Sequence, residues 1–206
     1  MGDIKRMTSL QDFQNTKITL SDICQKGKTI IANIADEKGR PTNIVLSKDC
    51  TLNTPWHVSS YDGGSRCSFD IVMTEVMQTM VTNIDKEVLD WTSNDTARYF
   101  KSPPKDIPSW YKSVNKEASK EGYSDTLRTT CTIIGEMASF KCWYGDRSAI
   151  STGDIKNINW PPSTFACEVA LKGVYFQANS FGPMLEVTDV MITPEDQSCP
   201  FDEIDE

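Results

Sequence analysis

The strongest constraint on the fold is a run of β-type sequence from Ile155 to Ile192, which contains two long stretches rich in apolar, β-branched and aromatic residues. The stretch from Thr164 to Phe176 predicts a long strand, with Gly173 at a bulge or a point of close backbone approach. Ser180-Phe181-Gly182-Pro183 predicts a turn, and Met184 to Ile192 predicts the returning strand. Because an isolated two-stranded hairpin is marginally stable in water, these strands are expected to belong to a larger sheet.

Strand patterns recur along the rest of the chain and are interrupted by one helical pattern. Apolar residues from Val76 to Trp91 recur at every third and fourth position, which predicts an amphipathic helix over about 74–92. About eight strands around one helix predict a mainly β chain of the OB-fold type: a five-stranded barrel with extra strands and this helix inserted. The further β-type runs are a hairpin over 29–47 and strands over 66–73, 126–134 and 138–144.

A single domain accounts for most of the 206 residues. Residues 1–16 are polar and are predicted to be loosely ordered, while 17–193 form the OB-fold-like domain with a helical and loop insertion over 74–125. Residues 194–206 are predicted to be a flexible acidic tail. Six acids lie in 195–206, so the rest of the chain carries a net charge of −2 out of the total of −8. A nearly neutral body can still present a locally basic groove.

Several functional classes are disfavoured by the sequence. No apolar stretch is long enough for a membrane helix, and the N-terminus has no signal-peptide pattern, so the predicted setting is intracellular and not secreted. The seven cysteines form no C-x-x-C pair, and most are expected to be reduced core thiols. His57 is the only histidine, and Gly27-Lys28-Thr29 lacks the first glycine of a phosphate-binding loop. The chain is therefore predicted to be no enzyme and to need no metal or cofactor.

Aromatic and basic residues alternate at several places, as expected of a surface that stacks bases and follows a phosphate backbone. Strand alternation places Lys141 and Trp143 on one face, which suggests a stacking platform; a Trp143 partly buried beneath loops is the equally weighted alternative. Lys112, Lys116 and Lys120 would share one face if their segment were helical. Tyr175 and Phe176 are expected to pack in the core. The predicted nucleic-acid contacts are Arg128, Lys141, Trp143, Tyr144, Arg147, Lys156, Trp160, Trp110, Tyr111 and Lys112.

Several segments of the C-terminal part of the chain form a recognisable pattern: Asn159-Trp160-Pro161-Pro162, Ala166 to Phe176, Ser180-Phe181-Gly182, Glu186 to Val190 and the tail residues Phe201, Asp202, Glu203, Asp205 and Glu206. With these segments, the chain resembles the single-stranded DNA-binding proteins of short-tailed phages and of large eukaryotic DNA viruses. The resemblance covers about 60–206 and implies an OB-fold, a role in DNA replication, recombination and repair, and a tail that contacts replication proteins such as a polymerase or helicase-primase. In the phage type the last residue is aromatic, whereas here Phe201 lies five residues before Glu206.

The sequence thus predicts a non-enzymatic single-stranded DNA-binding protein whose tail regulates access to DNA. One alternative is a β-rich protein-interaction or virion structural module, in which the aromatic residues form a protein interface. A second is a small metal-dependent nuclease that uses scattered carboxylates. The oligomeric state, including a homodimer, is left open.

Overall fold

Strands dominate the computed structural model, which describes residues 6–13, 16–27, 29–46, 52–60, 65–134, 137–151, 155, 157–161 and 163–193. The helices are α1 (Leu10–Phe13), α2 (Glu75–Asn94), α3 (Thr96–Tyr99) and the 3-10 helix η1 (Pro108–Trp110). The strands are β1 (Arg6–Ser9), β2 (Ile18–Leu20), β3 (Cys24–Lys26), β4 (Thr29–Ala32), β5 (Ile34–Asp36), β6 (Thr42–Val45), β7 (Ser59–Ser60), β8 (Arg66–Val72), β9 (Asn115–Lys116), β10 (Thr126–Ile134), β11 (Met137–Ala138), β12 (Lys141–Tyr144), β13 (Ala149–Ile150), β14 (Thr164–Phe176) and β15 (Phe181–Thr193).

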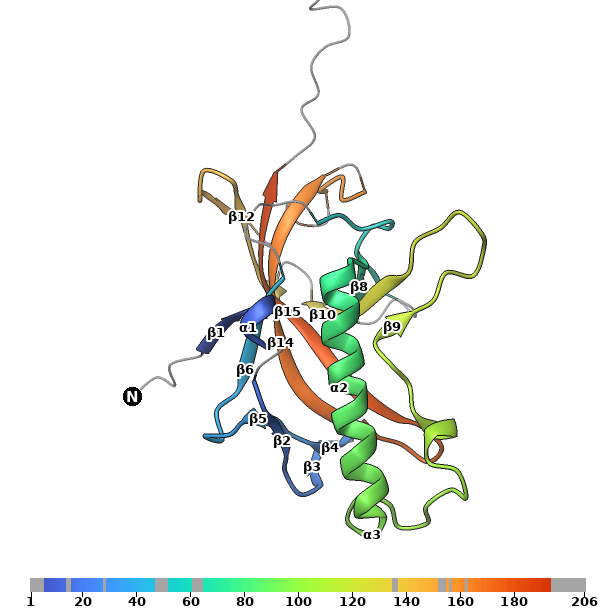
Figure 1. Cartoon of the computed structure of the whole chain (residues 1–206). Coiled ribbons are helices and arrows are strands. Elements are labelled where there is room, and N and C mark those ends of the chain that lie inside the picture. Colours follow the sequence, from blue (N-terminus) through green and yellow to red (C-terminus); the bar gives the residue numbers. More distant parts are fainter. Residues whose placement is uncertain are drawn as a thin grey trace, which may run out of the picture.

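The antiparallel hairpin of β14 and β15 forms the centre of the sheet, as the C-terminal β run predicts (Figure 1). Its turn lies earlier than expected and is closed by the Gln177 N–H, which donates to the Ser180 carbonyl at 2.8 Å. Phe181 therefore belongs to the strand. Its ring stacks on Phe176 with the ring centroids 5.8 Å apart, so the first residue pair of the hairpin is itself part of the core.

Most of the other strands extend this hairpin into a large curved sheet, whereas β2 and β5 form a separate two-stranded sheet. The hydrogen-bonded order is β1-β6-β14-β15-β10-β8-β7, and among the described strands this path does not return to its start. The mainly β, OB-fold-like class with an inserted helix is confirmed, with the sheet open rather than closed. The strands predicted over 29–47 are present, but β4 and β6 both pair with β14 and not with each other.

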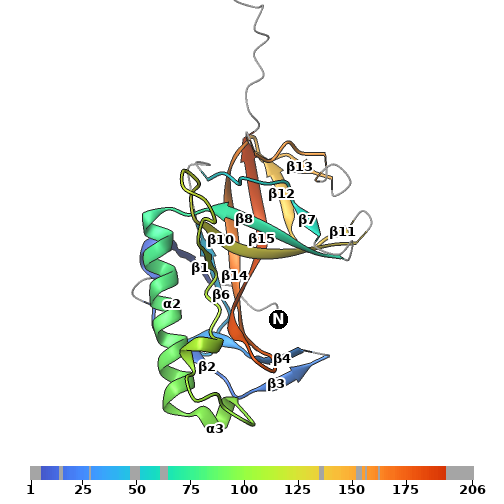
Figure 2. The ribbon, with the colours of Figure 1, turned by 90° about the vertical axis from the view of Figure 1, so that its right-hand side faces the viewer.

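Helix α2 confirms the predicted amphipathic helix closely. It begins after Thr74, whose side-chain oxygen accepts a hydrogen bond from the Met77 N–H at 3.3 Å and so caps the first turn. The helix lies along one side of the sheet (Figure 2). None of the helices in the described part of the chain has the length and apolarity that a membrane span requires. The buried side chains of α2 are Met77, Met80, Val81, Ile84, Val88 and Thr92.

The prediction of a loosely ordered N-terminus is wrong for residues 6–13. β1 pairs in parallel with β6, and Leu10 and Phe13 of α1 are buried in the core. The polar composition of the segment concealed these two apolar residues, which the fold uses as anchors.

Gly173 is confirmed as a point of close approach. It lies at a register shift between β14 and β15 and has a φ of +148°, a value that L side chains rarely adopt. A Cβ atom at this position would lie 2.3 Å from the Ala32 carbonyl oxygen, so only glycine lets β4 pass this closely.

An aromatic cluster forms one part of the core. Phe69 packs edge-on against Trp160 and Phe165, with ring centroids 5.0 and 5.4 Å away. Phe140 packs edge-on against the same Phe69 ring. The five cysteines among the described residues are free thiols: Cys24 is half-buried, and the other four, Cys67, Cys131, Cys142 and Cys167, are buried.

The turn after β5 makes the free energy of unfolding depend on pH in the acid range. Arg40 donates to the Asp36 carboxylate at 2.6 Å, the Lys38 and Arg40 N–H groups donate to it at 2.9 Å, and these bonds lower the pKa of Asp36 from 3.8 to about 2. Because the folded pKa is below the unfolded value, this contribution to stability is complete above pH 3.8 and is lost as the pH falls towards 2. We expect Asp36→Asn to lower the free energy of unfolding at about pH 6 and to have little effect near pH 2.

Urea unfolding of both proteins at the two pH values measures this difference. The control is Glu37→Gln, which changes an exposed acid of the same turn and should leave the pH dependence unaltered. An equal loss of stability at both pH values would contradict the assignment to Asp36 ionisation.

Candidate nucleic-acid interface

A groove lined by three basic side chains and a tyrosine runs between the upper and lower parts of the sheet. Its volume is about 240 Å³, and its cations are Arg66, Lys112 and Arg128, with Tyr175 beside them. Figure 2 shows β8 and β10 crossing above this region, with β4 and the turn end of the β14–β15 hairpin below. The groove also includes Thr29, Ser113, Val114, Thr130, Gln177, Pro183, Met184 and Leu185.

Strand alternation in the β8–β10 pair places the two arginines on the outer face. Arg128 lies opposite Asp70 and Arg66 lies opposite Thr132 in the antiparallel register. The neighbouring residues on these strands, such as Leu127 and Cys67, point into the core. The apolar positions of β8 and β10 therefore set the outward direction of both guanidinium groups.

Lys112 reaches the groove because its segment is attached to both the sheet and helix α2. Its N–H donates to the Phe181 carbonyl at 2.8 Å. On either side of it, the Tyr111 and Ser113 hydroxyls donate to the Asp85 carboxylate of α2 at 2.5 and 2.6 Å. Burial raises the pKa of Asp85, while the two hydrogen bonds oppose that rise. Burial next to Asp85 also raises the pKa of Tyr111, so its hydroxyl stays protonated as a donor.

Although Arg128 lies opposite Asp70 in the sheet, the acids on the adjacent strands are paired with lysines outside the groove. None of the residues that line the groove is acidic. Of the acids on the adjacent strands, Asp70 pairs with Lys116 at 3.0 Å and Glu186 pairs with Lys172 at 3.2 Å. None of the ion pairs found among the described residues involves Arg66, Lys112 or Arg128. The groove is therefore locally positive although the chain as a whole is acidic.

Tyr175 adds a half-exposed aromatic ring to this basic surface. Its neighbour Phe176 points to the opposite face of β14 and is buried against Tyr99 and Phe100. The expectation of core packing for this pair therefore holds for Phe176 but not for Tyr175. A tyrosine face beside unpaired cations is the combination that binds unstacked bases.

Of the predicted contact residues that the structure describes, Lys112 and Arg128 alone line the groove. Lys141, Trp143, Tyr144 and Arg147 lie on β12 and in the turn after it, beside the C-terminal end of β15. There Lys141 is opposite Asp189, to which the Trp143 indole N–H donates at 3.4 Å. Trp143 is half-buried and its polar edge is held by an acid, so this face is less suited to phosphate than the groove.

Three predicted aromatic contacts are used for packing instead. Trp160 is 1% exposed and lies in the core cluster with Phe69, so the prediction that it contacts DNA is wrong. Trp110 packs edge-on against Phe100, and Tyr111 packs edge-on against Phe181. Their proximity to Lys112 in sequence is misleading, because both rings pack against core aromatics while the Lys112 side chain is exposed. Lys156 and the tail residues Phe201, Asp202, Glu203, Asp205 and Glu206 lie outside the described residues.

The three lysines spaced by four residues do not lie on one face of a helix. The segment that holds Lys112, Lys116 and Lys120 is not helical, and Lys116 lies in the short strand β9 beside β10. Of the four groove residues that are basic or aromatic, Arg66 and Tyr175 are not among the predicted contacts. Arg66, Ser68 and Asp70 alternate with apolar residues, which indicates that the Arg66 side chain points outwards. The sequence does not show that the outer face of β8 borders a groove.

Gly182 maintains the close contact between the Lys112 segment and β15. A Cβ atom on Gly182 would lie 2.1 Å from the Lys112 carbonyl oxygen. We therefore expect Gly182→Ala to displace this backbone, to lower the stability of the fold by about 1–3 kcal/mol and to weaken oligonucleotide binding by moving Lys112. Thermal unfolding and an oligo-dT titration measure the two effects.

Gly145→Ala is the matched control, because a Cβ atom there would make an ordinary contact of 3.7 Å with Thr193. Gly182→Ala with unchanged stability and binding would show that the Lys112 segment is not held by this contact.

No group of three or more His, Cys, Asp or Glu side chains within the described ranges is arranged to hold a metal ion. No protein-family model and no curated protein sequence matches this chain.

A comparison of the fold with solved structures finds three structures of one phage protein. The single-stranded DNA-binding protein from bacteriophage Enc34 in complex with single-stranded DNA superposes with a TM-score of 0.44 at 11% identity, covering 88% of this chain and 98% of that one. Its C-terminal truncation gives 0.45 at 10% identity, with 87% and 97% covered. The same protein without a stated ligand gives 0.43 at 12% identity, with 91% and 99% covered. At such low TM-scores and sequence identities, the ligand of the phage protein cannot be assigned to this chain.

Proposed function

We propose that the protein binds single-stranded DNA in the groove between β10 and the β14–β15 turn, without sequence preference and without catalysis. The observation that carries this proposal is the meeting of Arg66, Lys112 and Arg128 with the half-exposed ring of Tyr175. None of these three cations is ion-paired to another described residue. Phosphates would pair with the cations, and a base would stack on the tyrosine. Because a base in a duplex is already stacked on its neighbours, the tyrosine favours a single strand.

Fluorescence anisotropy of a labelled oligo-dT, measured over a range of salt concentrations, tests the proposal. If three cations neutralise three phosphates, log K should fall with log salt with a slope of about −2. A duplex of the same length is the control and should bind more weakly. The absence of binding at low salt would refute this function and favour the protein-interaction module.

The acidic tail is proposed to regulate this site. Six acids and Phe201 within residues 195–206 could occupy the basic groove as a mimic of DNA, or could dock on a basic patch of a polymerase or helicase-primase. A variant ending at Thr193 should then bind oligo-dT more tightly than the full chain. The control is a full-length variant whose six tail acids are changed to Asn and Gln; it should bind as tightly as the truncated variant if charge is responsible.

Such a protein would act on the single strands exposed in replication, recombination and repair. The resemblance of the C-terminal part of the sequence and the basic groove both support this part of the proposal.

A further inference from the structure

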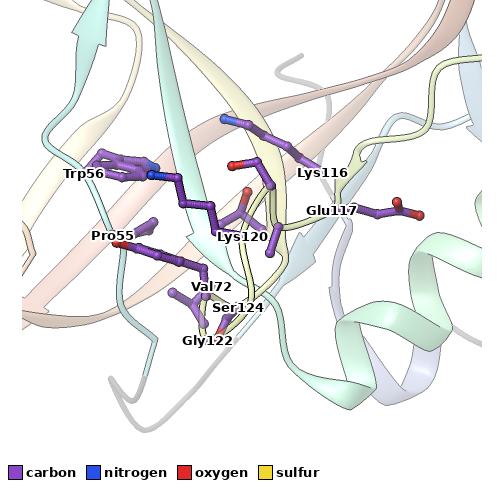
Figure 3. A pocket seen from close by; sticks show the side chains of 12 residues that line it. Pro55, Trp56, Val72, Lys116, Glu117, Lys120, Gly122 and Ser124 are labelled. Carbon is purple, nitrogen blue, oxygen red and sulfur yellow. The ribbon is translucent and has the colours of Figure 1, made fainter.

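A second pocket with two exposed aromatic rings lies on the surface formed by β8, β9 and β10. Its volume is about 380 Å³, and its lining includes Trp56, Tyr123, Lys116 and Lys120 (Figure 3). Trp56 is 56% exposed and Tyr123 is 62% exposed. Trp56 is the tryptophan most open to solvent among the five, since Trp91, Trp110 and Trp143 are half-buried and Trp160 is buried.

The pocket adjoins the basic groove along β10. Thr126 lines the pocket and Arg128 lines the groove, and both point to the same outer face of the strand. They are two residues apart, which is about 7 Å along a strand. The segment from Lys112 to Lys116 runs beside β10 and connects the two sites, because Lys116 pairs with Thr126 while the Val114 carbonyl accepts from the Arg128 N–H at 2.8 Å.

The charges of the pocket favour the same kind of ligand as the groove. In Figure 3 the Lys120 side chain extends towards the Trp56 ring, whereas Glu117 points away from it. Lys116 is paired with Asp70, whereas no ion pair within the described part of the chain involves Lys120, so Lys120 is the lysine of this lining that is available to a phosphate. An aromatic face with a free cation beside it again suits an unstacked base and its phosphate.

The Trp56 and Tyr123 rings do not pack in the core, so they contribute little to the stability of the fold. The Trp56 backbone is held by Thr54, whose hydroxyl donates to the Trp56 carbonyl at 3.0 Å, while the indole ring projects outwards. Tyr123 lies in a turn after β9, where its N–H donates to the Lys120 carbonyl at 3.4 Å. The backbone contacts thus hold two rings at the mouth of one pocket without burying either.

We propose that the Trp56–Tyr123 pocket is a second base-stacking site, which receives bases of the same DNA strand that occupies the groove. This inference rests on the proposed function and extends it. The strand would cross β10 from Arg128 towards Thr126, with Lys120 on a phosphate and Trp56 and Tyr123 on bases. A short oligonucleotide would fill only the groove, whereas a longer one would reach both sites.

Anisotropy titrations with oligo-dT of about 4 and about 16 nucleotides, the range that one such domain covers, test this inference. Trp56→Ala and Tyr123→Ala should each weaken binding of the long oligonucleotide by about 5- to 100-fold and leave binding of the short one unchanged. Met137→Ala is the control: Met137 is 69% exposed but lies on β11, outside the pocket and the groove, and its removal should change neither.

Intrinsic fluorescence gives a second readout. The long oligonucleotide should quench the wild type strongly and Trp56→Phe weakly. If both alanine variants bind the long oligonucleotide as the wild type does, the second site is refuted while the groove stands. If the wild type binds neither length, the proposed function itself fails. Equal weakening for both lengths would also refute the second site, because the short strand would then already contact the pocket.

Discussion

Reversing the charge of both Lys112 and Arg128 is expected to lower the affinity for single-stranded DNA by about 100-fold or more at low salt. The double variant Lys112→Glu/Arg128→Glu removes two of the three cations that line the groove and places two carboxylates where phosphates would lie. Because phosphate neutralisation drives this binding, the slope of log K against log salt should also become less negative by about 1.4. Anisotropy titrations with oligo-dT measure both quantities.

The control for this result is Lys141→Glu/Arg147→Glu, which changes the net charge by the same amount on β12 and in the turn after it. All four side chains are exposed, so neither double variant should unfold the protein. If the β12 variant weakened binding as much as the groove variant, the net charge or the β12 face would be responsible, and the position of the groove would be wrong. The comparison therefore tests the location of the site as well as its charge.

The second large effect concerns the core. Trp160→Ala is expected to lower the free energy of unfolding by about 3–5 kcal/mol. Trp160 is 1% exposed, its ring packs edge-on against Phe69 and Phe165, and its indole N–H donates to the Ile155 carbonyl at 3.3 Å. Truncation leaves a large cavity between these rings and removes one of the two donors to the Ile155 carbonyl, the other being the Ile158 N–H. Urea unfolding measures the change.

Trp56→Ala is the matched control, because it removes the same ring from an exposed position and should change stability by no more than about 0.5 kcal/mol. Trp160→Phe should lie between the two, since it keeps part of the buried volume but loses the indole donor. A Trp160→Ala variant as stable as Trp56→Ala would mean that the aromatic cluster around Phe69 contributes little.

Features that depend on neighbours in the sequence could be predicted. The helix of α2, the strands of the C-terminal hairpin and the close approach at Gly173 all follow from periodicity or from the conformational range of one residue. The hairpin turn was placed three residues too late, because Gly182 reads as a turn glycine when its actual role is to admit the Lys112 backbone.

The site could be predicted only in part. Arg128 and Lys112 were identified by type, but their meeting with Arg66 and Tyr175 depends on four chain segments that are far apart in sequence. Local composition cannot distinguish an aromatic ring that faces a groove from one that faces the core. Trp160 and Tyr175 show this, because each was assigned to the wrong environment.

The sequence by itself determined the strands, the helix and the alternation of inward and outward side chains, because these follow from backbone geometry over a few residues. The tertiary structure decided which outward faces meet. Pairing β4 and β6 with β14, and β8 with β10, curves the sheet and brings Arg66, Arg128, Lys112 and Tyr175 to one groove. Strand pairing over long sequence separations depends on the packing of the whole core, and no local pattern encodes that.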